Sequence, residues 1–232
     1  MMLEMTLGKL NQLKLSGMAD ALVEQTQNTI YTGLSFEERL GMLVDREMTV
    51  RDNRRLTNLL RGARLRYSSA CPEEIDFRTT RGLAKEVILS LMQNGWVKGK
   101  QNVIITGPTG SGKTFIACAL ANSACRNGYS AHYLRLPRLL QELHIARGDG
   151  SYGKLLTRLA KYAILIIDDW GLAKFADKER RDILEVLEDR HGIPQPSLPV
   201  RYPRTSGTTP SVIRPLPMPS WTGWCITHIR SH

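Results

Sequence analysis

The chain has 232 residues, enough for one domain of ordinary size and a smaller attached unit. Its cysteines are scattered without a C-x-x-C pair, which argues against a zinc site or a disulfide framework and for free thiols. The net charge of +10 favours a polyanionic partner, with nucleic acid first and an acidic membrane second. The N-terminus lacks a signal-peptide core, and no stretch approaches the roughly 20 apolar residues that cross a bilayer. We therefore expect a soluble, cytoplasmic protein.

Residues 1–66 are predicted to be helical, because apolar residues recur at helical spacing and no strand signal interrupts them. The stretch Ser35-Phe-Glu-Glu38 resembles a capping box and predicts a helix over 37–50. Further on, arginines strongly outnumber acidic residues, which indicates either a surface that follows nucleic acid phosphates or an ordinary solvated helix face. The candidate DNA contacts are Arg46, Arg51, Arg54, Arg55, Arg61, Arg64 and Arg66.

Residues 67–101 are predicted to be a connector that contains one helix over 80–93. After residue 101 the pattern changes to short apolar runs that alternate with amphipathic segments. Strands are predicted over 103–106, 131–134 and 163–167. Helices are predicted over 114–126, 137–147, 154–161 and 178–189. This alternation predicts an α/β fold, a parallel sheet sandwiched by helices.

A phosphate-binding loop follows the first predicted strand and opens a helix, which is the context that such a loop requires. Its glycines let backbone N–H groups surround phosphates, and the helix N-terminus adds partial positive charge. Lys113 is predicted to reach the β and γ oxygens of ATP, and Thr114 to offer a hydroxyl to Mg²⁺. The predicted nucleotide-binding residues are Gly107, Pro108, Thr109, Gly110, Ser111, Gly112, Lys113 and Thr114.

A second motif is the apolar run Ala163 to Ile167, which ends in Asp168 and Asp169. Two carboxylates at the end of a buried strand are typical of a Walker B element, in which Asp168 holds Mg²⁺ through its water shell. Asp169 stands where many such ATPases carry a glutamate that orients the attacking water. Arg190 has two interpretations, a contact to phosphate or to a neighbouring subunit, or a favourable charge at a helix C-terminus.

The composition changes abruptly after Glu188. Residues 189–232 hold eight of the eleven prolines and neither lysine nor glutamate. Prolines at this density predict that the tail contributes no interior strand or helix, so that the sheet stays incomplete. We therefore divide the chain into a helical N-terminal domain, a connector, a P-loop core and an irregular tail. The predicted ranges are 1–66, 67–101, 102–193 and 194–232.

Several stretches together resemble the IstB-type transposition helper ATPases of bacterial insertion sequences, which are relatives of the DnaC helicase loader. The resemblance covers residues 1 to about 193 and implies an AAA+ domain behind a helical N-terminal domain. It further implies an oligomer on double-stranded DNA and ATP turnover that regulates a partner transposase. The resemblance implies that Lys113 contacts phosphate and that Thr114 and Asp168 contact Mg²⁺. It also implies that Asp169 takes part in hydrolysis and that the arginines contact DNA. The stretches are Leu13–Leu22, Leu43–Glu47, the P-loop, Ile166–Leu172 and Leu184–Arg190.

The tail departs from that family, whose pattern calls for a fourth strand with a polar sensor residue and a lid with a trans-acting arginine. A frameshift explains this departure. When codons of Leu216–Ile226 are regrouped by one base, the Trp221–Thr222 junction must give aspartate and the Met218–Pro219 junction alanine. The other junctions permit the family's A-D-A-I-L-D-R-L-V-H-N in order. We hypothesise a frame slip near residue 193 or 194, which the gene's nucleotide sequence tests.

Three functional interpretations follow. The first is an ATP-dependent transposition helper whose hydrolysis is impaired in this copy. The second is a helicase loader, whose partner is a replicative helicase. The third is a module that binds ATP and DNA without hydrolysis. A small-molecule kinase is less well supported, because no substrate lid is recognisable and the basic helical N-terminus would have no role.

Overall fold

The computed structural model describes residues 2–77, 84–107, 110–170, 176–190, 214–215 and 224–229. It divides into two compact units, Met1–Asn58 and Leu59–His232, each of which is described here by itself. Within the described ranges, no helix combines the length and the apolar character that a membrane span requires.

The first unit is helical, as predicted. Its capping box is confirmed: Ser35 N donates to Glu38 Oε2 at 2.8 Å, and Glu38 N donates to Ser35 Oγ at 3.2 Å. The helix that follows does not end at residue 50 as predicted but continues to Ala63, because residues 51–61 contain no proline or glycine. The elements are α1 (Met2–Gln12), α2 (Ser16–Gln27), η1 (Thr29–Gly33) and α3 (Phe36–Ala63), whose last turn belongs to the second unit.

A side chain of α3 caps the first turn of α2. Glu47 is buried, and its Oε2 accepts hydrogen bonds from Gly17 N at 2.7 Å and Met18 N at 3.2 Å. Its Oε1 accepts from Arg51 Nε at 2.7 Å. These donors hold the pKa of the Glu47 carboxyl below its ordinary value, with the Arg51 bond as the largest cause. The free N–H groups of α2 are thus satisfied from another helix.

Gly17 is required by this close approach. A Cβ there would lie 2.8 Å from Glu47 Cα and 3.0 Å from Arg46 O, both backbone atoms. Gly17→Ala is therefore expected to lower the free energy of unfolding by about 1–3 kcal/mol, as overpacking does. Gly41, also helical, has nothing within 4 Å of such a Cβ, so Gly41→Ala should stabilise by about 0.5–1 kcal/mol. Urea unfolding of both variants checks the pair, and equal effects would contradict the packing.

The second unit is built on a mixed sheet, whose long strands are parallel. The strand order is β2-β3-β5-β1-β4, and only β4 runs antiparallel, against β1. The three strands that the sequence predicted agree with β1, β2 and β3 to within one residue at each end. The strands are β1 (Asn102–Gly107), β2 (Ala131–Arg135), β3 (Ile164–Asp168), β4 (Arg214–Pro215) and β5 (Trp224–Ile229).

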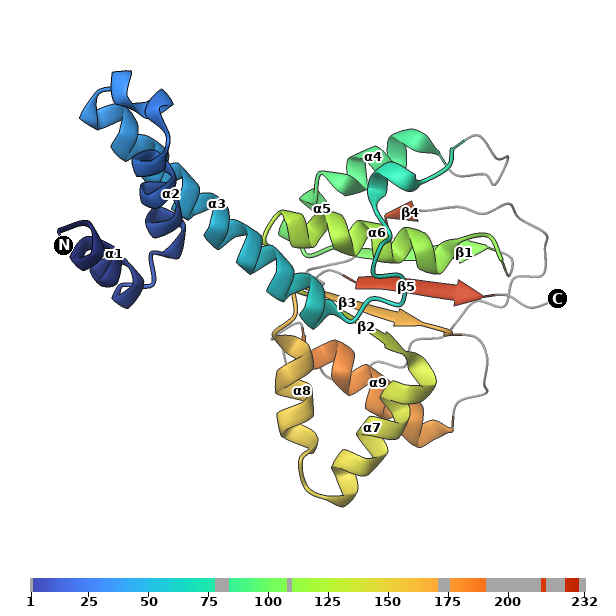
Figure 1. Cartoon of the computed structure of the whole chain (residues 1–232). Coiled ribbons are helices and arrows are strands. Elements are labelled where there is room, and N and C mark those ends of the chain that lie inside the picture. Colours follow the sequence, from blue (N-terminus) through green and yellow to red (C-terminus); the bar gives the residue numbers. More distant parts are fainter. Residues whose placement is uncertain are drawn as a thin grey trace. The chain divides into compact units, whose positions relative to one another are not determined.

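Helices cover both faces of this sheet, with α4 to α6 on one side and α7 to α9 on the other (Figure 1). Leu165 and Ile167 of β3 are fully buried in the core beneath α7, α8 and α9. The predicted α/β fold is thus confirmed. The elements are η2 (Pro72–Glu74), α4 (Lys85–Met92), α5 (Gly95–Lys98), α6 (Lys113–Arg126), α7 (Leu136–Gly148), α8 (Tyr152–Ala160) and α9 (Asp177–Asp189).

The tail does contribute to the sheet, so the prediction that it supplies no interior strand is wrong. β5 lies between β1 and β3, with Thr106 level with His228 and Ile167 level with Ile226. The physical reason is local composition: all eight tail prolines precede residue 220, and Trp224–Ile229 contains only residues that a strand accepts. The parallel sheet is therefore continuous from β2 to β1.

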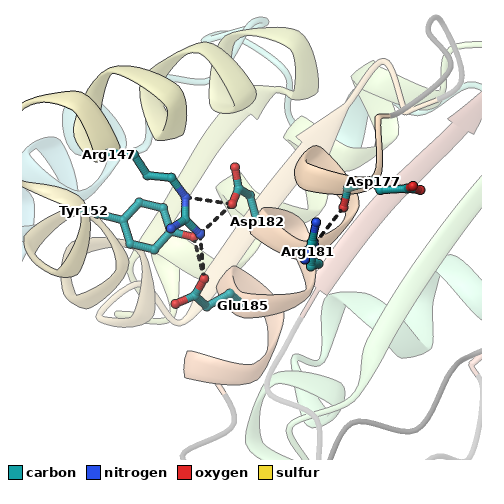
Figure 2. Close-up of polar contacts among 6 residues, drawn as sticks. All are labelled: Arg147, Tyr152, Asp177, Arg181, Asp182 and Glu185. Atoms are coloured by element: carbon teal, nitrogen blue, oxygen red, sulfur yellow. Dashed lines mark hydrogen bonds and ion pairs between the residues drawn. The ribbon is translucent and has the colours of Figure 1, made fainter.

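An ion-pair cluster joins the three helices on one face of the sheet (Figure 2). Arg147 of α7 lies 2.6 Å from Asp182 Oδ1 and 3.0 Å from Glu185 Oε2, both on α9. The Arg147 guanidinium also lies over the Tyr152 ring of α8, 3.9 Å from its centroid. Tyr152 donates to Glu185 at 2.8 Å. These contacts fix α9 against the helices that follow β2.

Candidate nucleotide site

The phosphate loop ends at the first turn of α6, where the backbone takes a shape that suits glycine. Gly110 and Gly112 have φ of +82° and +85°, a region that side chains disfavour. Gly112 O accepts the first helical bond from Ile116 N at 3.0 Å. Pro108 and Thr109 lie outside the described residues. The described part of the loop thus leads directly into a helix N-terminus, where phosphates bind.

Lys113 begins α6 and is buried, with 6% of its surface exposed. Burial lowers the pKa of its ammonium group, while the charge of Asp168 acts in the opposite direction. A cation held in a partly dry site interacts more strongly with an anionic ligand than one in bulk water. Lys113 therefore has the placement that the sequence predicted for a phosphate contact.

Asp168 ends β3 and is fully buried. Its Oδ2 accepts from Thr114 Oγ1 and from the Tyr133 hydroxyl, each at 2.8 Å. Its Oδ1 accepts from Asp169 N at 2.9 Å. Three donors therefore fix the orientation of this carboxylate.

The pair Thr114 and Asp168 fits Mg²⁺. Their two oxygens lie 2.8 Å apart, and hydroxyl and carboxylate oxygens are the ligands that this ion takes alongside water and phosphate. Among the described residues, no cluster of three or more His, Cys, Asp or Glu side chains could enclose a metal. The arrangement therefore suits an ion that arrives with a nucleotide, not one held in a protein cage.

Asp169 is the first residue beyond β3 and has a left-handed backbone, with φ of +61°. It is nearly buried, and its carboxylate forms an ion pair with Arg135 at the end of β2. Beside it lies a cavity of about 370 Å³ between α7 and α9, with Asp169 and Asp182 in its wall. The carboxylate thus has a charge partner on one side and open space on the other.

Arg190 proves to be a structural residue. It is buried, and its Nη1 donates to Leu159 O at 2.5 Å, near the end of α8. Its Nη2 lies 3.4 Å from Ala163 O. Burial lowers its pKa to about 10. Arg190 caps the C-terminal end of α9 and donates to a carbonyl in the last turn of α8, which agrees with the interpretation of a favourable charge at a helix C-terminus.

The arginines proposed for DNA are all exposed but do not belong to one unit. Four lie in the first unit and three in the second. Arg51 binds Glu47, and Arg54 Nη2 donates to Ser16 Oγ at 2.8 Å. A third, Arg66, lies beside the Tyr133 hydroxyl, an interaction that raises the pKa of Arg66.

Two residues of the site were missed at the level of sequence, Tyr133 and Arg135. They alternate along β2, and Arg135 is level with Asp168 in the parallel register. The carboxyl ends of neighbouring parallel strands meet at one sheet edge. Tyr133 and Arg135 are polar residues at alternate positions near the end of such a strand, and this pattern could have identified them from the sequence.

Comparison with known proteins agrees with this geometry. A family model described as IstB-like ATP binding protein matches residues 8–195. The chain is 48% identical over 231 residues to the insertion sequence IS1162 ATP-binding protein of Pseudomonas fluorescens, covering 100% of both. It is 44% identical over 187 residues to the insertion sequence ATP-binding protein y4pL of Sinorhizobium fredii, covering 81% of this chain and 76% of that one.

Solved structures show the fold. The DnaC helicase loader has a TM-score of 0.54 at 18% identity, covering 72% of this chain and 80% of that one. DnaA from Aquifex aeolicus, bound to AMPPCP, has a TM-score of 0.50 at 14% identity, covering 70% of this chain and 42% of that one. At these identities the likeness concerns the fold alone, and it agrees with the predicted α/β fold.

The tail is shared with at least one relative. The alignment to the IS1162 protein spans both chains, whereas the family model ends at residue 195. A frame slip private to this chain does not agree with that alignment. The frameshift hypothesis is therefore restricted to a slip that both chains carry, and it stays a prediction.

Proposed function

Because the chain belongs to the family of IstB-like ATP-binding proteins, we propose that it binds ATP with Mg²⁺ and acts as a DNA-associated helper of insertion-sequence transposition. The observation that carries the nucleotide part is the bond between Thr114 of the phosphate loop and the buried Asp168, at 2.8 Å. The transposition part is supported by relatives that belong to insertion sequences.

The proposed roles follow the placement of each side chain. Lys113 and the backbone N–H groups at the start of α6 bind the phosphates. Thr114 and Asp168 hold Mg²⁺, which when bound neutralises charge on the β and γ oxygens. Asp169 orients the attacking water, and Arg135 holds that carboxylate in place. The seven arginines between Arg46 and Arg66 contact duplex DNA, and a second copy of the chain completes an oligomer.

We further propose that turnover is slow in this copy. The tail sequence does not contain the A-D-A-I-L-D-R-L-V-H-N pattern in which the family carries its trans-acting arginine. Where such arginines have been removed, the loss is about 10³ to 10⁵ in rate. We therefore expect this chain to bind ATP even though it hydrolyses ATP slowly.

The test is an ATPase assay with and without duplex DNA on two proteins, this chain and a version with the reading frame restored after residue 193. We expect both to bind ATP, DNA to stimulate turnover, and the restored version to be faster. Equal turnover in the two would contradict the account of the tail.

The helicase-loader interpretation is favoured by the fold likeness to DnaC, which at 18% identity concerns the fold alone. A pulldown with a purified transposase and with a purified replicative helicase separates the two partners. Capture of the helicase alone would replace the transposition proposal. Steady DNA-stimulated hydrolysis would exclude a non-hydrolysing module.

A further inference from the structure

Tyr133 donates to Asp168 from outside both nucleotide motifs, unlike the two other donors found within the described part of the chain. Thr114 belongs to the phosphate loop, and Asp169 follows Asp168 in the chain. Tyr133 lies on the neighbouring strand β2, nearly buried, with its hydroxyl 2.8 Å from Asp168 Oδ2. Burial and the Asp168 carboxylate both raise the pKa of Tyr133. The hydroxyl therefore keeps the proton that it donates to Asp168.

The position of this bond bears on metal binding. Thr114 and Tyr133 donate to the same oxygen, so the carboxylate is held from the loop side and from the β2 side at once. A carboxylate that holds Mg²⁺ must present its oxygens in a narrow range of directions, because the ion demands near-octahedral geometry. Loss of a group that orients a metal ligand typically costs about 10- to 100-fold in metal affinity.

Tyr133 also contacts residues 64–71, the stretch that follows α3. This stretch is called the connector segment and is shorter than the connector predicted over 67–101. The Arg66 guanidinium of this segment lies 5.8 Å from the centroid of the Tyr67 ring, and its charge opposes the rise in the pKa of Tyr133 that burial and Asp168 cause. The adjacent Tyr67 packs on Phe115, which follows Thr114, with ring centroids 6.1 Å apart. The residue before Tyr133, His132, lies with its Nδ1 3.2 Å from Gly62 O in the last turn of α3.

The connector segment is therefore anchored on both sides of the candidate Mg²⁺ site. One anchor is Phe115, next to Thr114, and the other is Tyr133, bonded to Asp168. Ala63 precedes the segment and Ala70 lies within it, and both are fully buried. This stretch of chain is therefore packed into the second unit, to which it belongs. A displacement of the segment would therefore disturb the two side chains, Thr114 and Tyr133, that donate to Asp168 Oδ2.

We propose that Tyr133 is a positioning residue for the Mg²⁺ carboxylate and that it couples the connector segment to the nucleotide site. The inference rests on the proposed binding of ATP with Mg²⁺. Because coupling between two sites is reciprocal, Mg²⁺ and ATP stabilise the connector segment, and a perturbed segment weakens Mg²⁺ binding.

The first test is Tyr133→Phe in the full chain, with binding of a fluorescent ATP analogue followed as Mg²⁺ is varied. The Mg²⁺ midpoint is expected to rise by about 10-fold, in the range seen when groups behind metal ligands are removed. Analogue binding in EDTA stays at the wild-type level. Tyr162→Phe is the matched control, because the Tyr162 ring stacks on His132 with centroids 4.6 Å apart and, among the described contacts, Asp168 accepts no hydrogen bond from it.

The second test is Arg66→Gln, an exposed position that keeps the experiment decisive should Tyr133→Phe fail to fold. Its Mg²⁺ midpoint is expected to rise less than that of Tyr133→Phe, and the double variant to show no more than Tyr133→Phe alone, since the two act in series. Lys154→Gln, at an exposed position on α8, is the control. Arg66→Lys is expected to restore most of the wild-type midpoint.

The connector segment gives an independent readout. Amide hydrogen exchange over residues 64–71 is expected to slow when Mg²⁺ and the ATP analogue are added to the wild type, but not to Tyr133→Phe. Equal Mg²⁺ midpoints in Tyr133→Phe and Tyr162→Phe, or equal slowing of exchange in the wild type and Tyr133→Phe, would overturn the inference. Absence of any nucleotide binding by the folded wild type would instead overturn the proposed function.

Discussion

Lys113→Ala is expected to weaken ATP binding by about 10- to 100-fold, the equivalent of one charge-assisted hydrogen bond to phosphate. Lys113 is buried at the start of α6, where a partly dry environment strengthens its interaction with phosphate. Equilibrium binding of a fluorescent ATP analogue measures the effect directly.

The control for this variant is Lys154→Ala, an exposed lysine of α8. It removes the same charge from the chain at a position away from the phosphate loop. The long-range contribution of the net charge therefore appears in both variants, and only the local contact differs. Equal affinities in the two would show that Lys113 does not contact phosphate.

Asp169→Asn is expected to reduce DNA-stimulated ATP turnover by about 10²- to 10⁴-fold, the range for loss of a positioned base. An amide accepts a proton poorly and removes the negative charge that Arg135 pairs with. ATP affinity should not change, because phosphate contacts come from α6 and the loop. Steady-state phosphate release and analogue binding, measured on one preparation, separate the two effects.

Asp45→Asn provides the matched control for Asp169→Asn, since Asp45 is exposed on α3. It should leave both turnover and affinity at wild-type values. Turnover that survives in Asp169→Asn would assign the hydrolytic role to another residue of the site. A parallel loss of affinity would indicate that the substitution disturbs the loop.

Much of the second unit could be predicted from sequence because its strands are buried on both faces. Such strands are continuous apolar runs, and Val103–Thr106 and Ala163–Ile167 stand out against the amphipathic helices between them. Placing Asp168 at the end of one run and Lys113 after another was enough to bring them to the same sheet edge.

What could not be predicted depends on contacts between distant parts of the chain. Glu47 caps α2 only because α3 packs against Gly17, and no local pattern records that approach. Arg190 follows α9 but donates to the carbonyl of Leu159 in α8. The sequence around Arg190 does not reveal this contact. Tyr133 looks like any strand residue until β2 is placed beside β3.

The error in the tail has a different cause. Proline density was counted over residues 189–232 as a whole, although a strand needs only a short run free of proline. Trp224–Ile229 is such a run and fills the place between β1 and β3. Composition over a long window was thus less informative than the order of residues within it.

Isothermal titration of the full chain with ATP, in Mg²⁺ and again in EDTA, tests directly whether the chain binds ATP together with Mg²⁺. We expect saturable binding at about one site per chain, weakened by about 10-fold or more in EDTA, because Thr114 and Asp168 then have no metal to hold. No saturable binding by a chain that circular dichroism shows to be folded would contradict the assignment of the nucleotide site.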